Sequence, residues 1–246
     1  MPSILIGTSG YTYSWNKGKS NKFKWYVDQG FNSVEINGSF YRFPMENWIN
    51  NWKNLSRKNF NFSIKVHRSI THYTRLKGTK SINLWKRFKK SLEPIEHKIT
   101  FYLFQMPSTF KYNQENIDRI KSFIYNADLN NKGIIEFRNS AWWRKPSLKQ
   151  LEEIDFAMCS VDAPLLPRKI LNMNNTIYLR LHGSKTWYNY LYSEKELERI
   201  IRKIEKKSGN KKAIYLNNDH GMLPNGKYLL DHLIKVGKSR HQESAM

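Results

Sequence analysis

At 246 residues, 39% of them apolar, the chain can bury one sizeable core, and a single domain of the α/β-barrel size class is the natural expectation. Its 8 Trp, 14 Tyr and 13 Phe exclude a disordered chain. Its 42 Lys and Arg against 20 Asp and Glu give a formal charge of +22. That excess indicates either a polyanionic partner, such as nucleic acid or a phosphorylated substrate, or a lysine-rich solvated surface.

The sequence also bears on the compartment. No window approaches the roughly 18 uninterrupted apolar residues of a membrane helix, and the opening MPSILIGTSG lacks the long apolar stretch of a signal peptide. The single cysteine, Cys159, excludes an internal disulfide framework and is expected to be a small core residue in the run FAMCSV. We therefore expect a cytoplasmic protein that does not contact a membrane.

Strand-like and helix-like segments alternate along the chain. Short apolar runs bounded by turn residues predict eight strands, at 4–8, 33–37, 62–66, 99–105, 133–138, 156–162, 176–183 and 213–219. Helical spacing predicts helices at 23–30, 46–55, 81–92, 114–125 and 226–236, with two more from Ser147 and Ser193. Ser193 and Glu196 have the spacing of a capping box. The sixth strand leads into a proline-rich connection without a clear helix.

Eight short strands, all but the sixth followed by a helical connection, predict a parallel sheet buried on both faces. Eight such units in 246 residues fit a closed (β/α)8 barrel of the TIM type better than an open doubly wound sheet. The sequence contains no G-x-G-x-x-G, Walker or H-E-x-x-H pattern. We expect one α/β barrel domain over residues 1–238 and a frayed polar tail over 239–246.

Polar side chains two residues apart end most of the predicted strands. The run TIYLRLHG is the clearest case, because Arg180 and His182 fall on the face opposite its leucines. The active site of a barrel lies at the C-terminal ends of its strands, so all these polar residues are expected to face one cavity. They are Thr8, Ser9, Glu35, Asn37, Lys65, His67, Gln105, Glu136, Arg138, Asp162, Arg180, His182, Asn217 and Asn218.

So many buried charges must pair, bind a metal or meet a ligand, because an unpaired buried ion costs several kcal/mol. Some pairs, such as Glu136 with Arg138 or Asp162 with Arg180, can be purely structural. Two chemical uses remain open. In the first, a divalent metal ion is held by oxygen and nitrogen ligands from Glu35, Glu136, Asp162 and His182.

In the second use no metal is needed. A carboxylate or histidine moves a proton, while Lys65, Arg138 and Arg180 hold an anionic group of the substrate. Lys65 as a Schiff-base nucleophile is a less favoured variant.

The loops at the same end add aromatic and basic residues. Residues 9–25 interleave Tyr11, Tyr13 and Trp15 with four lysines. Such a mixture suits stacking on bases or sugar rings with phosphate contacts, although the rings could equally pack the loops onto the barrel rim. The loop HRSITHYTRLKG carries His72 and could act as a lid, with His72 as a catalyst or as a hydrogen-bonding anchor.

An ordered set of motifs resembles the YecE-like family, domain-of-unknown-function family 72. The motifs are IGTSGYTYSW, VEINGSFYRFP, FSIKVHRSITH, LFQMPSTF, IEFRNSAWW, SVDAP, YLRLHG and YLNND, from residue 4 to about 219. The resemblance implies a TIM-type barrel but no particular reaction. KTWYNYLY departs from the glycine-containing segment usual after the seventh strand. By motif matching, the shared cavity would contain Ser9, Tyr11, Trp15, Glu35, Tyr41, Lys65, His72, Glu136, Arg138, Asp162, Arg180, His182 and Asn217.

We expect a hydrolytic enzyme acting on a phosphate-bearing substrate, with nucleic acid as one candidate. The alternatives are a metal-free isomerase or lyase on a small anionic sugar or acid, and a non-catalytic nucleic-acid-binding protein. A divalent metal ion stays open as a cofactor, and the sequence indicates no oligomeric state. The expected catalytic residues are Glu136, Glu35, Asp162, His182 and Lys65, and the expected substrate-binding residues are Ser9, Tyr11, Trp15, Tyr41, His72, Arg138, Arg180 and Asn217.

Overall fold

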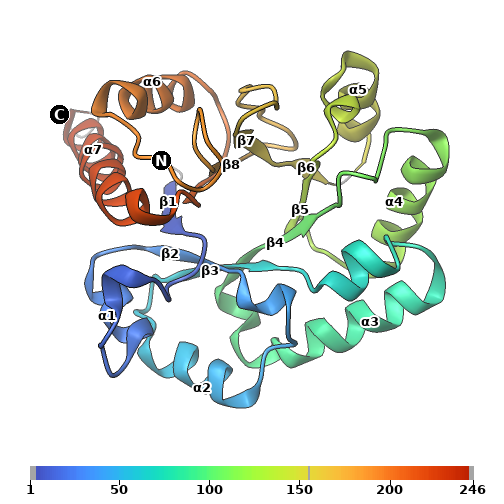
Figure 1. The fold of residues 1–246 in the computed structure, drawn as a ribbon, viewed down its shortest axis with the longest axis horizontal. Coiled ribbons are helices and arrows are strands. Elements are labelled where there is room, and N and C mark those ends of the chain that lie inside the picture. The colour runs from blue at the N-terminus through green and yellow to red at the C-terminus, as the bar shows by residue number, and fades with distance from the viewer. Residues whose placement is uncertain (1–3, 155, 244–246) are drawn as a thin grey trace. The chain divides into compact units, whose positions relative to one another are not determined.

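The computed structural model of the chain describes residues 4–154 and 156–243 (Figure 1). It divides into two compact units. The first unit is built from the chain up to residue 34, residues 57–60 and the chain from residue 160 on, and the second from residues 35–56 and 61–159. The boundary therefore falls within strand β2 (Ser33–Ile36).

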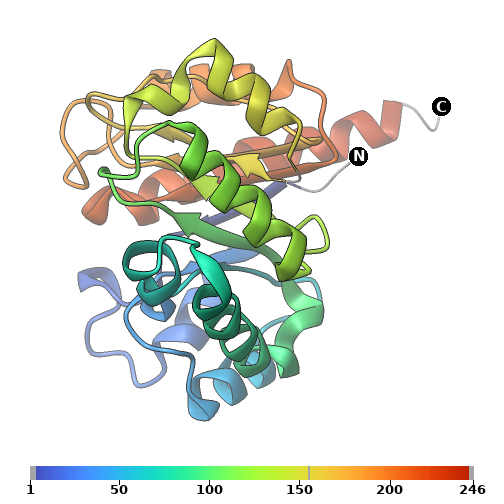
Figure 2. The same cartoon turned by 90° about the vertical axis from the view of Figure 1, so that its right-hand side faces the viewer.

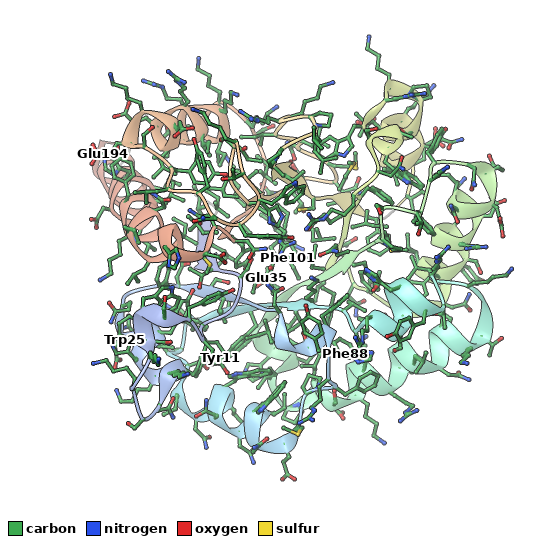
Figure 3. All side chains as sticks on the ribbon, viewed as in Figure 1. Tyr11, Trp25, Glu35, Phe88, Phe101 and Glu194 are labelled. Atoms are coloured by element: carbon green, nitrogen blue, oxygen red, sulfur yellow. The ribbon has the colours of Figure 1, made fainter. Side chains whose placement is uncertain are left out.

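The first unit contains a four-stranded parallel sheet in the order β1-β9-β8-β7. Most residues of these strands are buried, and burial on both faces explains why their sequences are nearly continuous apolar runs. The predicted capping box of Ser193 and Glu196 is present at the start of helix α6, where Glu194 is labelled in Figure 3. The elements of this unit are β1 (Ile4–Thr8), α1 (Lys22–Asp28), β7 (Ser160–Asp162), β8 (Thr176–Leu181), α6 (Glu194–Glu205), β9 (Lys211–Leu216) and α7 (Met222–Glu243).

The second unit holds strands of a five-stranded sheet in the order β2-β3-β4-β5-β6, and the pairs from β3 to β6 are parallel. Helices α3 and α4 pack side by side on this unit (Figure 2). Asn113 caps α4, because its side chain accepts a hydrogen bond from the Asn116 backbone N–H at 2.8 Å. Besides β2, its elements are α2 (Glu46–Leu55), β3 (Asn61–Lys65), α3 (Gly78–Ser91), β4 (Ile99–Gln105), α4 (Gln114–Ala127), β5 (Gly133–Glu136), α5 (Lys145–Glu152) and β6 (Ala157–Met158).

Aromatic side chains fill much of the core of the second unit. Trp85 is fully buried between helix α3 and strand β4, with its ring 4.9 Å from that of Tyr102. Its indole N–H donates to the carbonyl of Ala127 at 2.7 Å, so burying this polar atom leaves no hydrogen bond unmade. Phe88, one turn further along the same helix and labelled in Figure 3, is also fully buried.

The predicted α/β class and its parallel strands are confirmed, and the closure of the sheets into one barrel stays a prediction. The predicted strand 156–162 is wrong as one element. It is broken at Cys159 into β6, which pairs with β5, and β7, which pairs with β8. Each part adds a short edge to a different sheet, so the structure has nine strands where eight were predicted, counted over the described residues.

The last helix is longer than predicted. Helix α7 continues to Glu243, past the end of the predicted helix at residue 236, because the polar residues that follow are compatible with a helix and include no proline. The last three residues of the predicted tail, 244–246, lie outside the described residues. Along the part of the chain that is described, no helix is long and apolar enough to cross a membrane.

Candidate functional site

Strand register determines which polar side chains share a face in each unit. In the second unit Lys65 is paired with Leu103, and Glu136 with Gln105. Since Leu103 and Gln105 are two residues apart on β4, all four side chains lie on one face of the sheet. The charged groups of this face, Lys65 and Glu136, lie at the C-terminal ends of their strands.

A compact group of side chains surrounds Lys65, and we call it the Lys65 cluster: Phe40, Lys65, His72, Glu136 and Arg138. The ammonium nitrogen of Lys65 lies 4.3 Å from the centroid of the Phe40 ring, and the His72 ring packs edge-on against the same ring at 4.9 Å. Phe40 thereby fixes the positions of both side chains. Lys65 is only 9% exposed, so its charge is largely removed from water.

Glu136 and Arg138 form the ion pair of this cluster. A carboxylate oxygen of Glu136 lies 2.6 Å from Nε of Arg138, and the carboxylate is fully buried while the arginine side chain is 14% exposed. The pair that the sequence offered as a structural alternative is therefore present. The ion pair holds the guanidinium of Arg138 close to the end of β5, two residues after the last residue of the strand.

His72 lies among the cations of the second unit and is half-buried. Burial is the main reason that its pKa is lowered to about 4, and the charges of Lys65, Arg75 and Arg138 lower the pKa further. His72 is therefore uncharged at neutral pH. Its Nδ1 lies 2.9 Å from the Thr71 hydroxyl.

A second group, which we call the His182 cluster, occupies the strand ends of the first unit: Ser9, Arg180, His182 and Asn217. Register places Gly7, Tyr215 and Arg180 side by side, so residues two positions further on each strand continue the same face. Arg180 is fully buried, and its guanidinium lies 3.4 Å from the Ser9 hydroxyl. The side-chain amide of Asn217 lies 3.1 Å from Nδ1 of His182.

The loop after β8 brings two aromatic rings to His182. Trp187 and Tyr188 have their ring centroids 5.4 and 5.5 Å from the imidazole. Gly183 makes this return possible, because its φ is +113° and a Cβ there would overlap the carbonyl of Thr186. The segment KTWYNYLY, which departs from the family pattern, is thus a folded cover over the His182 ring.

The Asp162 side chain lies on the opposite face of the sheet from the His182 cluster, although its backbone carbonyl accepts from the His182 N–H at 2.9 Å. The register pairs Asp162 with Leu181 and Val161 with Arg180, so the expectation that Asp162 shares a face with Arg180 is wrong. The reason is that Val161, one residue earlier, lies beside Arg180, and successive side chains of a strand point to opposite faces. Asp162 instead accepts a hydrogen bond from the Ser184 hydroxyl at 3.1 Å and lies 3.6 Å from Arg168.

Asp162 borders a cavity of about 160 Å³ between β7, β8 and α6. The cavity has an apolar floor that includes Leu179 and Leu181, and its rim includes Arg168, Lys169, Arg199 and Lys203. Burial raises the pKa of Asp162 above its usual range.

Tyr11 and Trp15 have packing partners. The Tyr11 ring lies 5.1 Å from Phe23, and the Trp15 ring lies 5.5 Å from Trp25, both residues of α1 (Figure 3 labels Tyr11 and Trp25). These rings pack the first loop against helix α1.

Tyr41 is 65% exposed and Glu35 is fully buried in β2, next to β3. The four proposed metal ligands are divided between the units, with Glu35 and Glu136 in the second and Asp162 and His182 in the first. Within either unit, as far as its residues are described, no three His, Cys, Asp or Glu side chains form a group that could hold a metal ion.

The sequence predictions missed several residues around the Lys65 cluster. Phe40 contacts both Lys65 and His72, and Arg68 lies over the rings of Tyr41 and Tyr73. The sequence signal for these residues was the alternation of aromatic and basic residues in GSFYRF and HRSITHYTR. Of these two segments, the predicted catalytic and substrate-binding residues included only Tyr41 and His72.

Comparison with known proteins places the chain in a family. The family described as "Protein of unknown function DUF72" matches residues 5–238. The UPF0759 protein YunF of Bacillus subtilis is 23% identical over 269 residues, covering 93% of this chain and 94% of that protein.

Solved structures agree on the fold. A crystal structure of a DUF72 family protein from Thermotoga maritima has a TM-score of 0.82 at 22% identity, covering 94% of this chain and 99% of that one. One from Enterococcus faecalis has a TM-score of 0.81 at 20% identity, covering 94% and 95%. The resemblance drawn from the eight sequence motifs is confirmed: the chain belongs to the DUF72 family.

Proposed function

We propose that this protein is a hydrolytic acid–base enzyme that acts on a phosphate-bearing substrate at the Lys65 cluster. The observation that carries the proposal is the gathering of Lys65, Arg75 and Arg138 around one half-buried histidine. Lys65 and Arg138 are largely out of water, and such cations gain most from meeting an anion, while Arg75 is exposed. A phosphate group would place negative charge where these cations gather. Arginine in particular can donate two parallel hydrogen bonds to two phosphate oxygens.

The roles of the side chains follow from their positions. Lys65 and Arg138 bind phosphate oxygens, and Glu136 keeps the Arg138 guanidinium at the end of β5. His72 is uncharged in the free protein because its pKa is about 4, so it can accept a proton from an attacking water. When the Thr71 hydroxyl accepts the Nδ1 proton in a hydrogen bond, the lone pair lies on Nε2.

Bound phosphate also changes His72 itself. An anion beside the histidine offsets the three positive charges and raises its pKa toward neutrality, where a proton acceptor is most effective. Substrate binding thus prepares the acid–base group.

The test is a turnover assay on phosphodiesters, phosphomonoesters and sugar phosphates, with and without Mg²⁺, Mn²⁺ or Zn²⁺. His72→Gln removes the proton acceptor, and Glu136→Gln removes the charge of the carboxylate while keeping its shape. For a group that moves a proton we expect a loss in kcat of roughly 10²–10⁴-fold. The matched control is His97→Gln, an exposed histidine of the same unit, which should retain full activity.

Other outcomes select the alternatives. Turnover of a sugar phosphate without incorporation of ¹⁸O from labelled water would identify an isomerase or lyase. A wild-type protein that hydrolyses none of these compounds, yet binds nucleic acid tightly, would be a binding protein and the proposal would fail.

A further inference from the structure

An exposed surface of aromatic rings and one guanidinium adjoins the Lys65 cluster. Tyr41 and Tyr73 are 65% and 68% exposed, and the guanidinium carbon of Arg68 lies 5.9 and 5.7 Å from their ring centroids. These distances are within the range of cation–π contacts. We call Tyr41, Arg68 and Tyr73 the tyrosine platform.

The platform is joined to the Lys65 cluster by ring contacts. The Tyr41 ring packs edge-on against Phe40 at 5.0 Å, and Phe40 in turn contacts Lys65 and His72. Exposure alone does not distinguish these tyrosines, since Tyr125 on α4 is 88% exposed. What distinguishes Tyr41 is one ring, Phe40, between it and a cationic site.

The backbone holds the two groups together through one π-helical turn, Ser69–Tyr73. His72 on this turn reaches the Phe40 ring, and the adjacent Tyr73 reaches Arg68. The Thr74 hydroxyl donates to the carbonyl of Ser69 at 3.0 Å and has the carbonyl of Ile70 at the same distance, which fixes the end of the turn. Such π turns occur often at functional sites.

The next two residues adopt an uncommon backbone conformation. Arg75 and Leu76 have φ values of +50° and +60°, which cost free energy for side chains other than glycine. Leu76 is nevertheless buried, and its N–H donates to the Ile70 carbonyl at 3.1 Å. The segment is therefore held in place by its contacts in spite of the cost.

We propose that the tyrosine platform stacks a nucleobase whose adjoining phosphate lies in the Lys65 cluster, so that the substrate is single-stranded nucleic acid. This inference rests on the proposed function, to which it adds the substrate class. Exposed rings with an arginine among them accept any base, because every base offers a π face, and the basic groups beside them follow the phosphates. The formal charge of +22 favours the same partner over a neutral one.

The experiment measures binding of a fluorescently labelled single-stranded oligonucleotide by anisotropy, beside an abasic oligonucleotide of the same length. Tyr41→Ala and Tyr73→Ala should each weaken binding of the normal oligonucleotide by roughly 5- to 100-fold, as expected for one lost base stack. The control, Tyr125→Ala, removes a still more exposed ring elsewhere in the unit and should leave the affinity unchanged. The abasic oligonucleotide should bind wild type more weakly and be insensitive to the platform variants.

The outcomes separate this inference from the proposed function. If Lys65→Met weakens binding of both oligonucleotides while Tyr41→Ala and Tyr73→Ala behave like Tyr125→Ala, the phosphate site stands and the stacking inference fails. If the platform variants weaken binding of the normal oligonucleotide only and Lys65→Met changes nothing, stacking stands and the phosphate site fails. Competition by a neutral oligosaccharide that depends on the same tyrosines would show a sugar-binding surface and overturn the nucleobase.

Discussion

The two histidine clusters differ in what surrounds the imidazole. His72 is half-buried among three cations and has a pKa of about 4. His182 is fully buried, and its contacts include an amide at 3.1 Å and two aromatic rings. Charge gathered around a partly exposed group suits an anion that arrives and leaves, whereas ring and amide contacts around a fully buried imidazole fix its orientation. This difference supports the proposal that the Lys65 cluster, and not the His182 cluster, binds an anion.

The ion pairs of the two units also differ in how far they are exposed to water. Glu136 is fully buried beside Arg138, which is 14% exposed. Asp162 is 15% exposed, but its partner Arg168 is 53% exposed and lies 3.6 Å away. Because water screens the second pair far better than the first, the two pairs should differ widely in what their loss costs.

The largest effect is expected for Arg138→Met. It removes the ion-pair partner of a fully buried carboxylate, and the free energy of unfolding should fall by about 3–5 kcal/mol. The matched change, Arg168→Met, should cost less than about 1 kcal/mol because that pair is exposed. Urea unfolding followed by tryptophan fluorescence measures both.

A second variant distinguishes the loss of the ion pair from a loss of side-chain packing. The double variant Glu136→Gln, Arg138→Met removes both charges and should recover part of the lost stability. Equal losses for Arg138→Met and Arg168→Met would mean that burial does not separate the two pairs.

The next effect is expected at Gly183, whose conformation shapes the cover over His182. Gly183→Ala would force a Cβ against the Thr186 carbonyl at a φ of +113° and should destabilise the protein by about 1–3 kcal/mol. Gly18→Ala is the control, since Gly18 also has a positive φ, +83°, but open space around it, and about 1 kcal/mol is expected there. Similar losses at both glycines would show that the close approach of the loop is unimportant.

The sequence predicted more of the fold than of the site. Alternating apolar runs and helix signals placed nearly all the elements, and the capping box at Ser193 is present where it was predicted. The place of Asp162 was predicted wrongly because the sequence does not show which residue of its strand lies beside Arg180. Val161 is paired with Arg180, so Asp162 lies on the opposite face.

Other parts of the site could not be predicted because they depend on contacts distant in sequence. Phe40 sits beside Lys65 only because their segments pack together, and nothing in GSFYRF specifies that contact. The loop aromatics Tyr11 and Trp15 read the same as Tyr41 in sequence, yet the first two pack on α1 while Tyr41 stays exposed. Composition indicated the stacking chemistry, and only the packing shows which rings are available for it.

A smaller effect is expected in the titration of His72. By ¹H–¹⁵N NMR of the imidazole we expect a pKa of about 4 in the free protein and a higher one with inorganic phosphate present. Lys65→Met should also raise the pKa, because it removes one of the charges that lower it. A lowered pKa means that stability is fully present above the ordinary value of 6.5 and is lost as pH falls toward 4. A free-protein value near 6.5, unmoved by phosphate, would remove the electrostatic argument for an anion site.

The smallest effect is expected for Asp162→Asn. This variant also tests whether Asp162 differs from Glu136 in its role, as the difference between their ion pairs suggests. Burial raises the pKa of this carboxyl, so the ionised form is less favourable in the folded state than in the unfolded one. Its contribution to stability is therefore present below the ordinary value of 3.8 and is lost as pH rises through the raised value. Asn avoids that loss at neutral pH and still accepts from the Ser184 hydroxyl, so Tm at pH 7 should rise by about 1–3 °C and the gain should vanish near pH 3. If Asp162 carried catalysis as the sequence suggested, the same variant would lose roughly 10²–10⁴-fold in kcat; its place on the face of Leu181, away from Arg180, leads us to expect kcat close to that of wild type.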